Sequence, residues 1–130
     1  MSGTKHKVFT ILLVEDDAGD VDMFLRTVEH ELPRHEDEQV TLVINATAEG
    51  ALERLQQQPI DLIIADVRLP GMSGIELLRR VQDLNRRIPV IIVSWVHAIE
   101  TVIDAMRHGA FDYIVKPYDT MDLSASIHRA

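Results

Sequence analysis

Five apolar, strand-like segments alternate along this chain with five segments whose apolar residues have helical spacing. The first strand-like segment, residues 8–14, is rich in apolar and β-branched side chains. It is followed by Val21, Leu25 and Val28, which recur at intervals of four and three residues and predict a helix. Strict alternation of strands and helices, in units of about 25 residues, is typical of a parallel sheet covered by helices.

The remaining segments continue this alternation. Strand-like runs are predicted at residues 40–44, 60–65, 90–93 and 112–115. Helices are predicted by four further groups of apolar residues: Ala48, Ala51, Leu52 and Leu55; Leu77, Leu78, Val81 and Leu84; Ile99, Val102, Ile103 and Met106; and Leu123 and Ile127. The first helix should end at Leu32, before Pro33, and Gly109 should follow the end of the fourth. Right-handed connections between such units predict an α/β fold, a doubly wound five-stranded parallel sheet.

Composition narrows the class of protein. A chain of 130 residues, 46% of them hydrophobic, can form one domain with its own core. We expect a single domain over residues 1–130, which could also be a fragment of a longer multidomain protein because the last helix runs to Ala130. The net charge of −8 disfavours direct binding of nucleic acid. The absence of cysteine is compatible with the cytoplasm, and no apolar run approaches the roughly 20 residues of a membrane span.

Charged residues directly follow three of the predicted strands. Glu15 and Asp16 follow the first strand, Asp66 follows the third, and Lys116 follows the fifth. Ligands of open α/β sheets bind beyond the carboxyl ends of the strands. Carboxylates gathered there repel one another unless a cation lies between them, and Mg²⁺ prefers oxygen ligands. The sequence therefore predicts magnesium-dependent phosphoryl chemistry at this edge of the sheet.

Asp17, next to the first acidic pair, has two interpretations. It could be a further metal ligand, or it could cap the first helix, as Asp often does. We favour capping for Asp17 and metal binding for Asp16.

Five short motifs, in this order and spacing, resemble the receiver domain of bacterial two-component response regulators. They are Leu13-Val-Glu-Asp-Asp17, Asp61-Leu-Ile-Ile-Ala-Asp66, Leu69-Pro-Gly-Met-Ser-Gly74, Val93-Ser94 and Tyr113-Ile-Val-Lys-Pro117. The resemblance covers nearly the whole chain. It implies a flavodoxin-like receiver fold with strand order 2-1-3-4-5, which places the first and third strands side by side. It also implies a cis peptide bond before Pro117.

The resemblance implies a role for each residue of the motifs. Asp66 is the expected phosphoacceptor, a carboxylate nucleophile that forms an aspartyl phosphate. Lys116 is expected to pair with the Asp66 carboxylate and later with the phosphoryl group, from a solvent-facing strand end. Ser94 is expected to hydrogen-bond a phosphoryl oxygen, and Tyr113 to turn into the space that Ser94 leaves.

A magnesium ion is the cofactor that the resemblance implies. Its expected ligands are Glu15, partly through water, Asp16, Asp66 and the main-chain carbonyl of Arg68.

The implied function is a phosphorylation-dependent signalling switch in a two-component phosphorelay. A histidine kinase or a histidine phosphotransfer protein is the expected donor. The surface formed by the fourth helix, fifth strand and fifth helix is expected to contact an output domain or a second copy. The domain would catalyse its own phosphorylation and dephosphorylation, without turnover of an external substrate. We expect it to be cytoplasmic and to bind neither nucleic acid nor membrane directly.

Three alternative functions compete with this one. A haloacid dehalogenase-type phosphohydrolase needs a second aspartate two residues after the nucleophile, where this chain has Arg68. A flavodoxin needs a phosphate-binding loop after the first strand, where four of residues 15–20 are acidic and would repel phosphate. The third is a receiver-like interaction module with little or no phosphorylation, because Trp95 follows Ser94 where the family usually has Ala or Gly. We expect the Trp95 ring to cover the pocket in part, near Met72 or Ile99.

Overall fold

The protein is described by a computed structural model that covers residues 7–31, 38–85 and 87–130. Strands and helices alternate along it as predicted. In chain order they are β1 (Lys7–Val14), α1 (Ala18–Glu31), β2 (Glu38–Asn45), α2 (Ala48–Gln57), β3 (Leu62–Ala65), α3 (Gly74–Leu84), β4 (Val90–Ser94), α4 (Ile99–Arg107), β5 (Asp112–Val115) and α5 (Thr120–Arg129).

The five strands form one parallel sheet in the order β2-β1-β3-β4-β5. The predicted α/β class and strand order are therefore confirmed. Four of the five strands differ from the prediction by one or two residues at a bound: β1 begins at Lys7, β2 extends beyond residues 40–44 at both ends, β3 begins at Leu62 rather than at residue 60, and β4 ends at Ser94. The extension of β2 includes Glu38 and Gln39, which pair with β1 through their backbones. A hydrophobicity pattern does not report such pairing because it reads side chains only.

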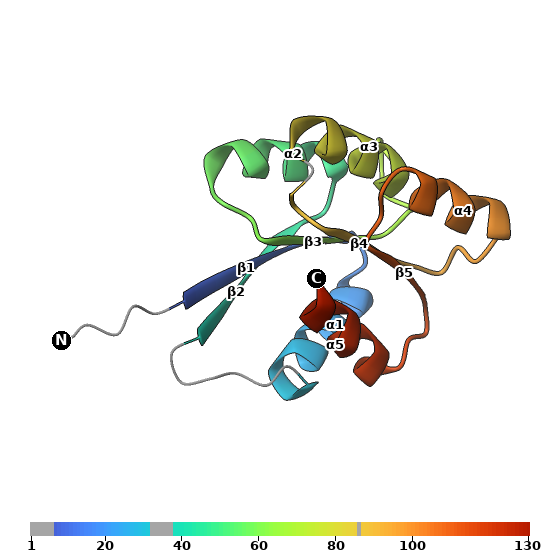
Figure 1. Cartoon of the computed structure of the whole chain (residues 1–130). Helices are drawn as coiled ribbons and strands as arrows, with labels where there is room; N and C mark the ends of the chain where they lie inside the picture. The colour runs from blue at the N-terminus through green and yellow to red at the C-terminus, as the bar shows by residue number, and fades with distance from the viewer. Residues whose placement is uncertain (1–6, 32–37, 86) are drawn as a thin grey trace.

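Helices cover both faces of the sheet. Figure 1 shows α2, α3 and α4 on one side and α1 and α5 on the other. Successive strand residues point to opposite faces, so Leu12 and Ile63 belong to the core under α2, α3 and α4, whereas Ile11 and Ile64 belong to the core under α1 and α5. All four residues of β3 are buried. Burial on both faces explains why the apolar residues of this strand run without alternation.

Side-chain caps define where several helices begin. Thr47, Ser73 and Asp119 each accept a hydrogen bond from a backbone N–H in the first turn of α2, α3 and α5. Gly109 has a φ of +93° just after α4, which confirms the predicted helix end. The predicted end of the first helix at Leu32 lies outside the described residues. None of the helices in the described part of the chain has the length and hydrophobicity needed to cross a membrane.

Candidate functional site

The order of the strands brings the acidic residues together. Val14 at the end of β1 is paired with Ala65 at the end of β3. Glu15 and Asp66 are the next residues of the two strands, and both are buried, with 6% and 7% of their surface exposed. Two carboxylates at such neighbouring strand ends need a positive partner, because their charges are desolvated and close together.

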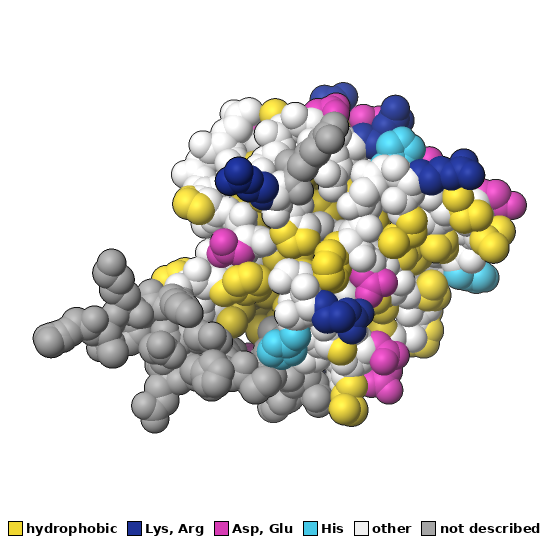
Figure 2. All heavy atoms as spheres, in the orientation of Figure 1, with side chains coloured by type: hydrophobic (Ala, Val, Ile, Leu, Met, Phe, Trp, Pro, Cys, Tyr) yellow, Lys and Arg dark blue, Asp and Glu magenta, His cyan; other side chains and the backbone are white. Residues whose placement is uncertain are grey.

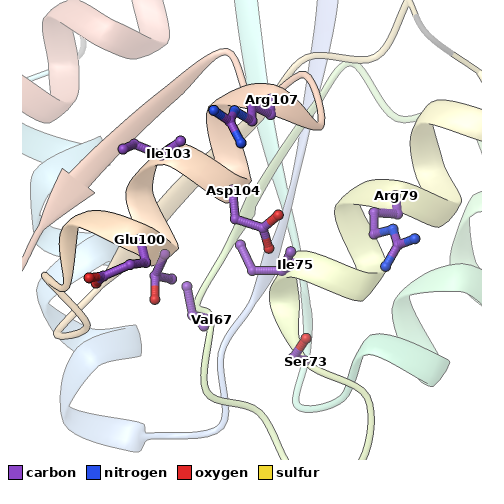
Figure 3. Close-up of a pocket in the computed structure, with 9 residues that line it drawn as sticks. Val67, Ser73, Ile75, Arg79, Glu100, Ile103, Asp104 and Arg107 are labelled. Atoms are coloured by element: carbon purple, nitrogen blue, oxygen red, sulfur yellow. The ribbon is translucent and has the colours of Figure 1, made fainter.

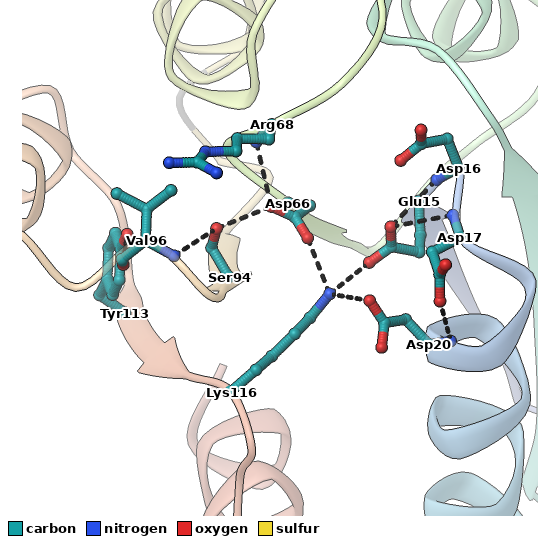
Figure 4. A network of polar contacts seen from close by, with 10 residues as sticks. All are labelled: Glu15, Asp16, Asp17, Asp20, Asp66, Arg68, Ser94, Val96, Tyr113 and Lys116. Carbon is teal, nitrogen blue, oxygen red and sulfur yellow. Dashed lines mark hydrogen bonds and ion pairs between the residues drawn. The ribbon is translucent and has the colours of Figure 1, made fainter.

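Lys116 is that partner, and it is more buried than expected. Its ammonium donates to Glu15 Oε1 at 2.6 Å, to Asp66 Oδ2 at 2.7 Å and to Asp20 Oδ2 at 2.7 Å (Figure 4). Only 6% of Lys116 is exposed, so the expectation of a solvent-facing lysine was wrong. The lysine follows β5, but its side chain reaches back across the strand ends toward α1. The peptide bond between Lys116 and Pro117 is cis, as expected.

The carboxylate of Asp66 is held at both oxygens. Ser94 Oγ donates to Asp66 Oδ1 at 2.7 Å, and the backbone N–H of Arg68 donates to the same oxygen at 3.0 Å. Burial alone raises the pKa of Asp66, but the hydrogen bonds from Lys116, Ser94 and Arg68 outweigh it and hold this pKa below its ordinary value. Asp66 is therefore ionised at neutral pH, the state that a carboxylate nucleophile requires.

The pKa values of Glu15 and Lys116 are both raised, but for different reasons. Burial raises the pKa of Glu15 more than the contact with Lys116 lowers it. Burial lowers the pKa of Lys116, but its hydrogen bonds to Asp20, Asp66 and Glu15 raise that pKa above its ordinary value. Lys116 is therefore a permanent cation at neutral pH.

Asp16 and Asp17 lie beside this cluster in different roles. Their backbone N–H groups donate to Glu15 Oε2 at 3.1 and 3.2 Å. The Asp17 carboxylate accepts from the N–H of Asp20 at 2.8 Å, in agreement with the capping interpretation. The Asp16 side chain is exposed and points away from Lys116 (Figure 4). Metal binding by Asp16 stays a prediction.

Among the described residues, one group of carboxylates has the spacing of a metal site: Glu15, Asp20 and Asp66. One oxygen from each lies within 4.8 Å of the others. Such hard oxygen donors fit Mg²⁺. Asp20 was absent from the expected ligands. Its signal in the sequence was its place three residues after the capping Asp17, in the helical turn nearest the end of β1.

Ser94 is linked to Tyr113 through the loop before α4. Ser94 Oγ accepts from the N–H of Val96 at 3.2 Å, and the Tyr113 hydroxyl donates to the carbonyl oxygen of Val96. Ser94 points toward Asp66, and Tyr113 packs against the core under α2, α3 and α4. Ser94 and Tyr113, which are expected to move together, are thus connected through the backbone of Val96.

A glycine allows α3 to begin directly against the backbone of Asp66. A Cβ added to Gly74 would lie 1.9 Å from the carbonyl oxygen of Asp66. Real Cβ atoms do not approach a backbone oxygen that closely. Gly74 therefore belongs to the site through its lack of a side chain.

Apolar side chains gather on the surface over α4 (Figure 2). The exposed large hydrophobic residues along α4, β5 and α5 are Ile99, Ile103, Met106, Val115 and Met121. Trp95, in the loop before α4, is 53% exposed. It is not among the residues that line the small cavity beside Asp66 and Lys116.

A groove of about 820 Å³ lies between α3 and α4 (Figure 3). Its walls carry both signs of charge: Arg79 lies on α3, and Glu100, Asp104 and Arg107 lie on α4. Val67, the residue after Asp66, also lines it. The groove therefore adjoins the site, and its width depends on where α4 lies.

The fold and the site together define a receiver domain: a parallel sheet of this order carrying an aspartate, a lysine and a hydroxyl at its strand ends. The chain belongs to the response regulator receiver domain family, whose family model matches residues 11–128. The confirmed class agrees with the resemblance seen in the sequence motifs.

Several curated response regulators are similar to parts of this chain. The transcriptional regulatory protein ZraR of Escherichia coli (strain K12) is 40% identical over 80 residues, which are 62% of this chain and 18% of ZraR. The regulatory protein LuxO of Vibrio cholerae is 32% identical over 91 residues, which are 70% of this chain and 20% of LuxO. The matched region thus spans about a fifth of each relative.

Solved receiver domains share the whole fold. A receiver domain protein (CheY-like) from Methanospirillum hungatei has a TM-score of 0.82 and 28% identity, covering 95% of this chain and 93% of that one. The receiver domain of an HD domain-containing protein from Pseudomonas fluorescens has a TM-score of 0.84 and 25% identity, covering 95% and 94%.

Proposed function

We propose that this domain is a phosphorylation-dependent switch of a two-component phosphorelay in the cytoplasm, with Asp66 as the phosphoacceptor. The observation that carries the proposal is the environment of Asp66, an ionised carboxylate held by Ser94 and Arg68 at one oxygen and by Lys116 at the other. The donor would be a histidine kinase or a histidine phosphotransfer protein, the general kind of partner that response regulators have.

The transfer step follows from these contacts. A carboxylate oxygen of Asp66 attacks the phosphorus of a phosphohistidine, an O–P bond forms, and the P–N bond breaks. The leaving histidine nitrogen keeps the electron pair and takes up a proton. Lys116 and Ser94 donate hydrogen bonds toward the charge that builds up on the phosphoryl oxygens, a stabilisation that acts strongly in a buried site.

Magnesium would be held by Glu15, Asp16 and Asp66 with the main-chain carbonyl of Arg68, and Asp20 adds a carboxylate to this set. When bound, it would neutralise part of the negative charge on the transferred group. The ammonium group of Lys116 contacts both Glu15 and Asp66, which lie at neighbouring strand ends.

The proposed readout passes through Ser94, Val96 and Tyr113 to α4. A phosphoryl group adds about −2 charge and new acceptors beside Ser94. Ser94 is hydrogen-bonded to the N–H of Val96, so a shift of Ser94 would move the backbone of Val96. The carbonyl of Val96, which accepts the hydrogen bond from Tyr113, would move with it. The exposed apolar residues of α4, β5 and α5 are the proposed surface for an output domain or a second copy.

Labelling with acetyl phosphate and Mg²⁺, read by intact mass, tests this function. We expect one phosphoryl group per chain in the presence of Mg²⁺ and none when the metal is chelated. In this role the protein would hydrolyse only the phosphoryl group that it carries on Asp66, and it would have no external substrate. Absence of labelling by both acetyl phosphate and a phosphorylated histidine phosphotransfer protein would contradict the proposal.

The same assay separates the switch from an interaction module in which Trp95 blocks the pocket. The half-exposed Trp95 ring lies outside the cavity lining beside Asp66. If the ring nevertheless crowds the entry of donors, Trp95→Ala will be labelled faster than wild type. Wild-type protein that resists labelling while Trp95→Ala accepts it would favour the interaction module.

A further inference from the structure

Lys116 has an acidic partner to which the receiver motifs give no role, Asp20 in the first turn of α1. Its contact with Asp20 Oδ2 is as short as its contact with Asp66 Oδ2, 2.7 Å in both cases. An ammonium group has three N–H donors. The contacts with Glu15, Asp20 and Asp66 use all of them. Asp20 therefore holds one of the three donors of the lysine on which phosphoryl transfer depends.

Asp20 is well placed to be a fixed anchor. Its backbone N–H is bonded to the capping carboxylate of Asp17 at 2.8 Å. The helix that carries it packs into the core through Phe24 and Val28, which are 3% and 2% exposed. Its own side chain is 25% exposed. The carboxylate thus sits at the start of a packed helix rather than on a loop.

Lys116 lies in largely apolar surroundings, where the loss of any one of its hydrogen bonds would be costly. The cavity beside its side chain is lined mainly by apolar groups, among them Phe24, Val93 and Tyr118. A buried N–H donor that loses its partner there is left without water, at a considerable cost. When Asp66 carries a phosphoryl group, the donor that faced Asp66 must turn to a phosphoryl oxygen. The other two contacts decide whether the ammonium stays in reach.

We propose that Asp20 is a positioning residue for phosphoryl transfer to Asp66, an inference that rests on the proposed function. It holds the Lys116 ammonium from the α1 side, through a contact that does not involve Asp66. Glu15 contacts the same ammonium from the end of β1, so the two carboxylates hold it from two different elements.

Two effects of Asp20 oppose each other, and this makes the proposal testable. Through Lys116, Asp20 should strengthen the binding of a phosphoryl group. By its own negative charge, it should repel that group. Only the first effect needs Lys116, so a double-mutant cycle between the two residues separates them.

The experiment measures the affinity for beryllofluoride, a phosphoryl mimic, by calorimetry at saturating Mg²⁺. The proteins are wild type, Asp20→Asn, Lys116→Gln and the double variant, each checked for folding by circular dichroism. Asp22→Asn is the matched control, because Asp22 is an exposed aspartate of the same helix. We expect Asp20→Asn to weaken binding roughly tenfold when Lys116 is present, the loss of about one charge-assisted contact. In the Lys116→Gln background it should cause no weakening, and Asp22→Asn should behave as wild type.

Three outcomes would overturn the proposal. Equal weakening in both Lys116 backgrounds would make Asp20 a direct metal ligand. Unchanged or tighter binding in Asp20→Asn alone would show that repulsion is its main effect. If Asp22→Asn weakens beryllofluoride binding as much as Asp20→Asn does, the effect comes from the net charge of the helix and not from the contact with Lys116. If Lys116→Gln binds the mimic too weakly to titrate, the same cycle is run on the rate of labelling by acetyl phosphate. Failure of wild type to be labelled would instead contradict the proposed function itself.

Discussion

Ser94 Oγ donates a hydrogen bond to Asp66 Oδ1 at 2.7 Å, across 28 positions of sequence. Both residues are buried, at the ends of the neighbouring strands β4 and β3. The same hydroxyl accepts from the N–H of Val96. One oxygen therefore connects Asp66, the proposed phosphoacceptor, to the loop that leads into α4.

Tyr113→Phe should separate phosphorylation from its readout. The variant loses the hydroxyl that donates to the carbonyl oxygen of Val96 but keeps the ring. We expect an unchanged labelling rate with acetyl phosphate and a smaller fluorescence change of Trp95 on addition of beryllofluoride. Tyr118→Phe is the matched control, because Tyr118 lies on the Lys116 side of the site. Slower labelling in Tyr113→Phe would place Tyr113 in the chemistry instead.

Lys116→Met should destabilise the protein, and Mg²⁺ should restore much of the loss. Removal of the ammonium leaves the buried Glu15 and Asp66 without their shared cation. Breaking such a buried pair costs about 3 kcal/mol, toward the lower end here because one carboxylate can take up a proton. Urea denaturation at neutral pH with and without Mg²⁺ measures both effects. Arg107→Met on the surface of α4 is the control, and equal stability of Lys116→Met and wild type would contradict the buried-cluster account.

The contribution of Lys116 to stability should show no loss at mildly alkaline pH. Because its pKa is raised in the folded state, the stability is fully present below the ordinary lysine value of 10.5 and is lost only as pH rises through the folded pKa. The difference in unfolding free energy between wild type and Lys116→Met should therefore show no alkaline loss that sets in below the ordinary lysine pKa. Such a loss at mildly alkaline pH would mean that Lys116 titrates early.

Gly74→Ala should disrupt both the fold and the site. Its new Cβ would meet the carbonyl oxygen of Asp66 at 1.9 Å, and a backbone atom can give way only if the loop moves. Overpacking of this kind costs roughly 1–3 kcal/mol. We expect lower stability and slower labelling. Gly19→Ala is the matched control, since its Cβ would meet only a side-chain oxygen of Asp17 at 3.2 Å. Normal labelling of Gly74→Ala would show that the loop adapts.

Asp16→Asn should weaken Mg²⁺ binding and phosphorylation together. Asp16 is exposed next to Glu15 and is an expected metal ligand, although its side chain points away from Lys116. Loss of one charged oxygen ligand should lower the affinity about tenfold. Titration calorimetry compares it with Asp22→Asn. Unchanged Mg²⁺ affinity in Asp16→Asn would remove Asp16 from the set and leave Glu15, Asp20 and Asp66.

The sequence predicted the fold because strands such as β3 are buried on both faces and their apolar runs are continuous. It also predicted which residues follow the strands, so Asp66 and Lys116 could be named. The burial of Lys116 could not be predicted, because it depends on how its side chain crosses the sheet edge. Asp20 was missed because its contact with Lys116 spans 96 positions, and a local pattern identifies only a helix start.

The measurement that tests the account most directly locates the phosphoryl group on the chain. Protein labelled with acetyl phosphate and Mg²⁺ is reduced with borohydride, which converts a phosphorylated aspartate to homoserine, and the peptides are sequenced by mass spectrometry. We expect homoserine at position 66 alone and no labelling of Asp66→Asn. Homoserine at position 16, 17 or 20, or labelling that persists in Asp66→Asn, would contradict the assignment of Asp66 as the phosphoacceptor.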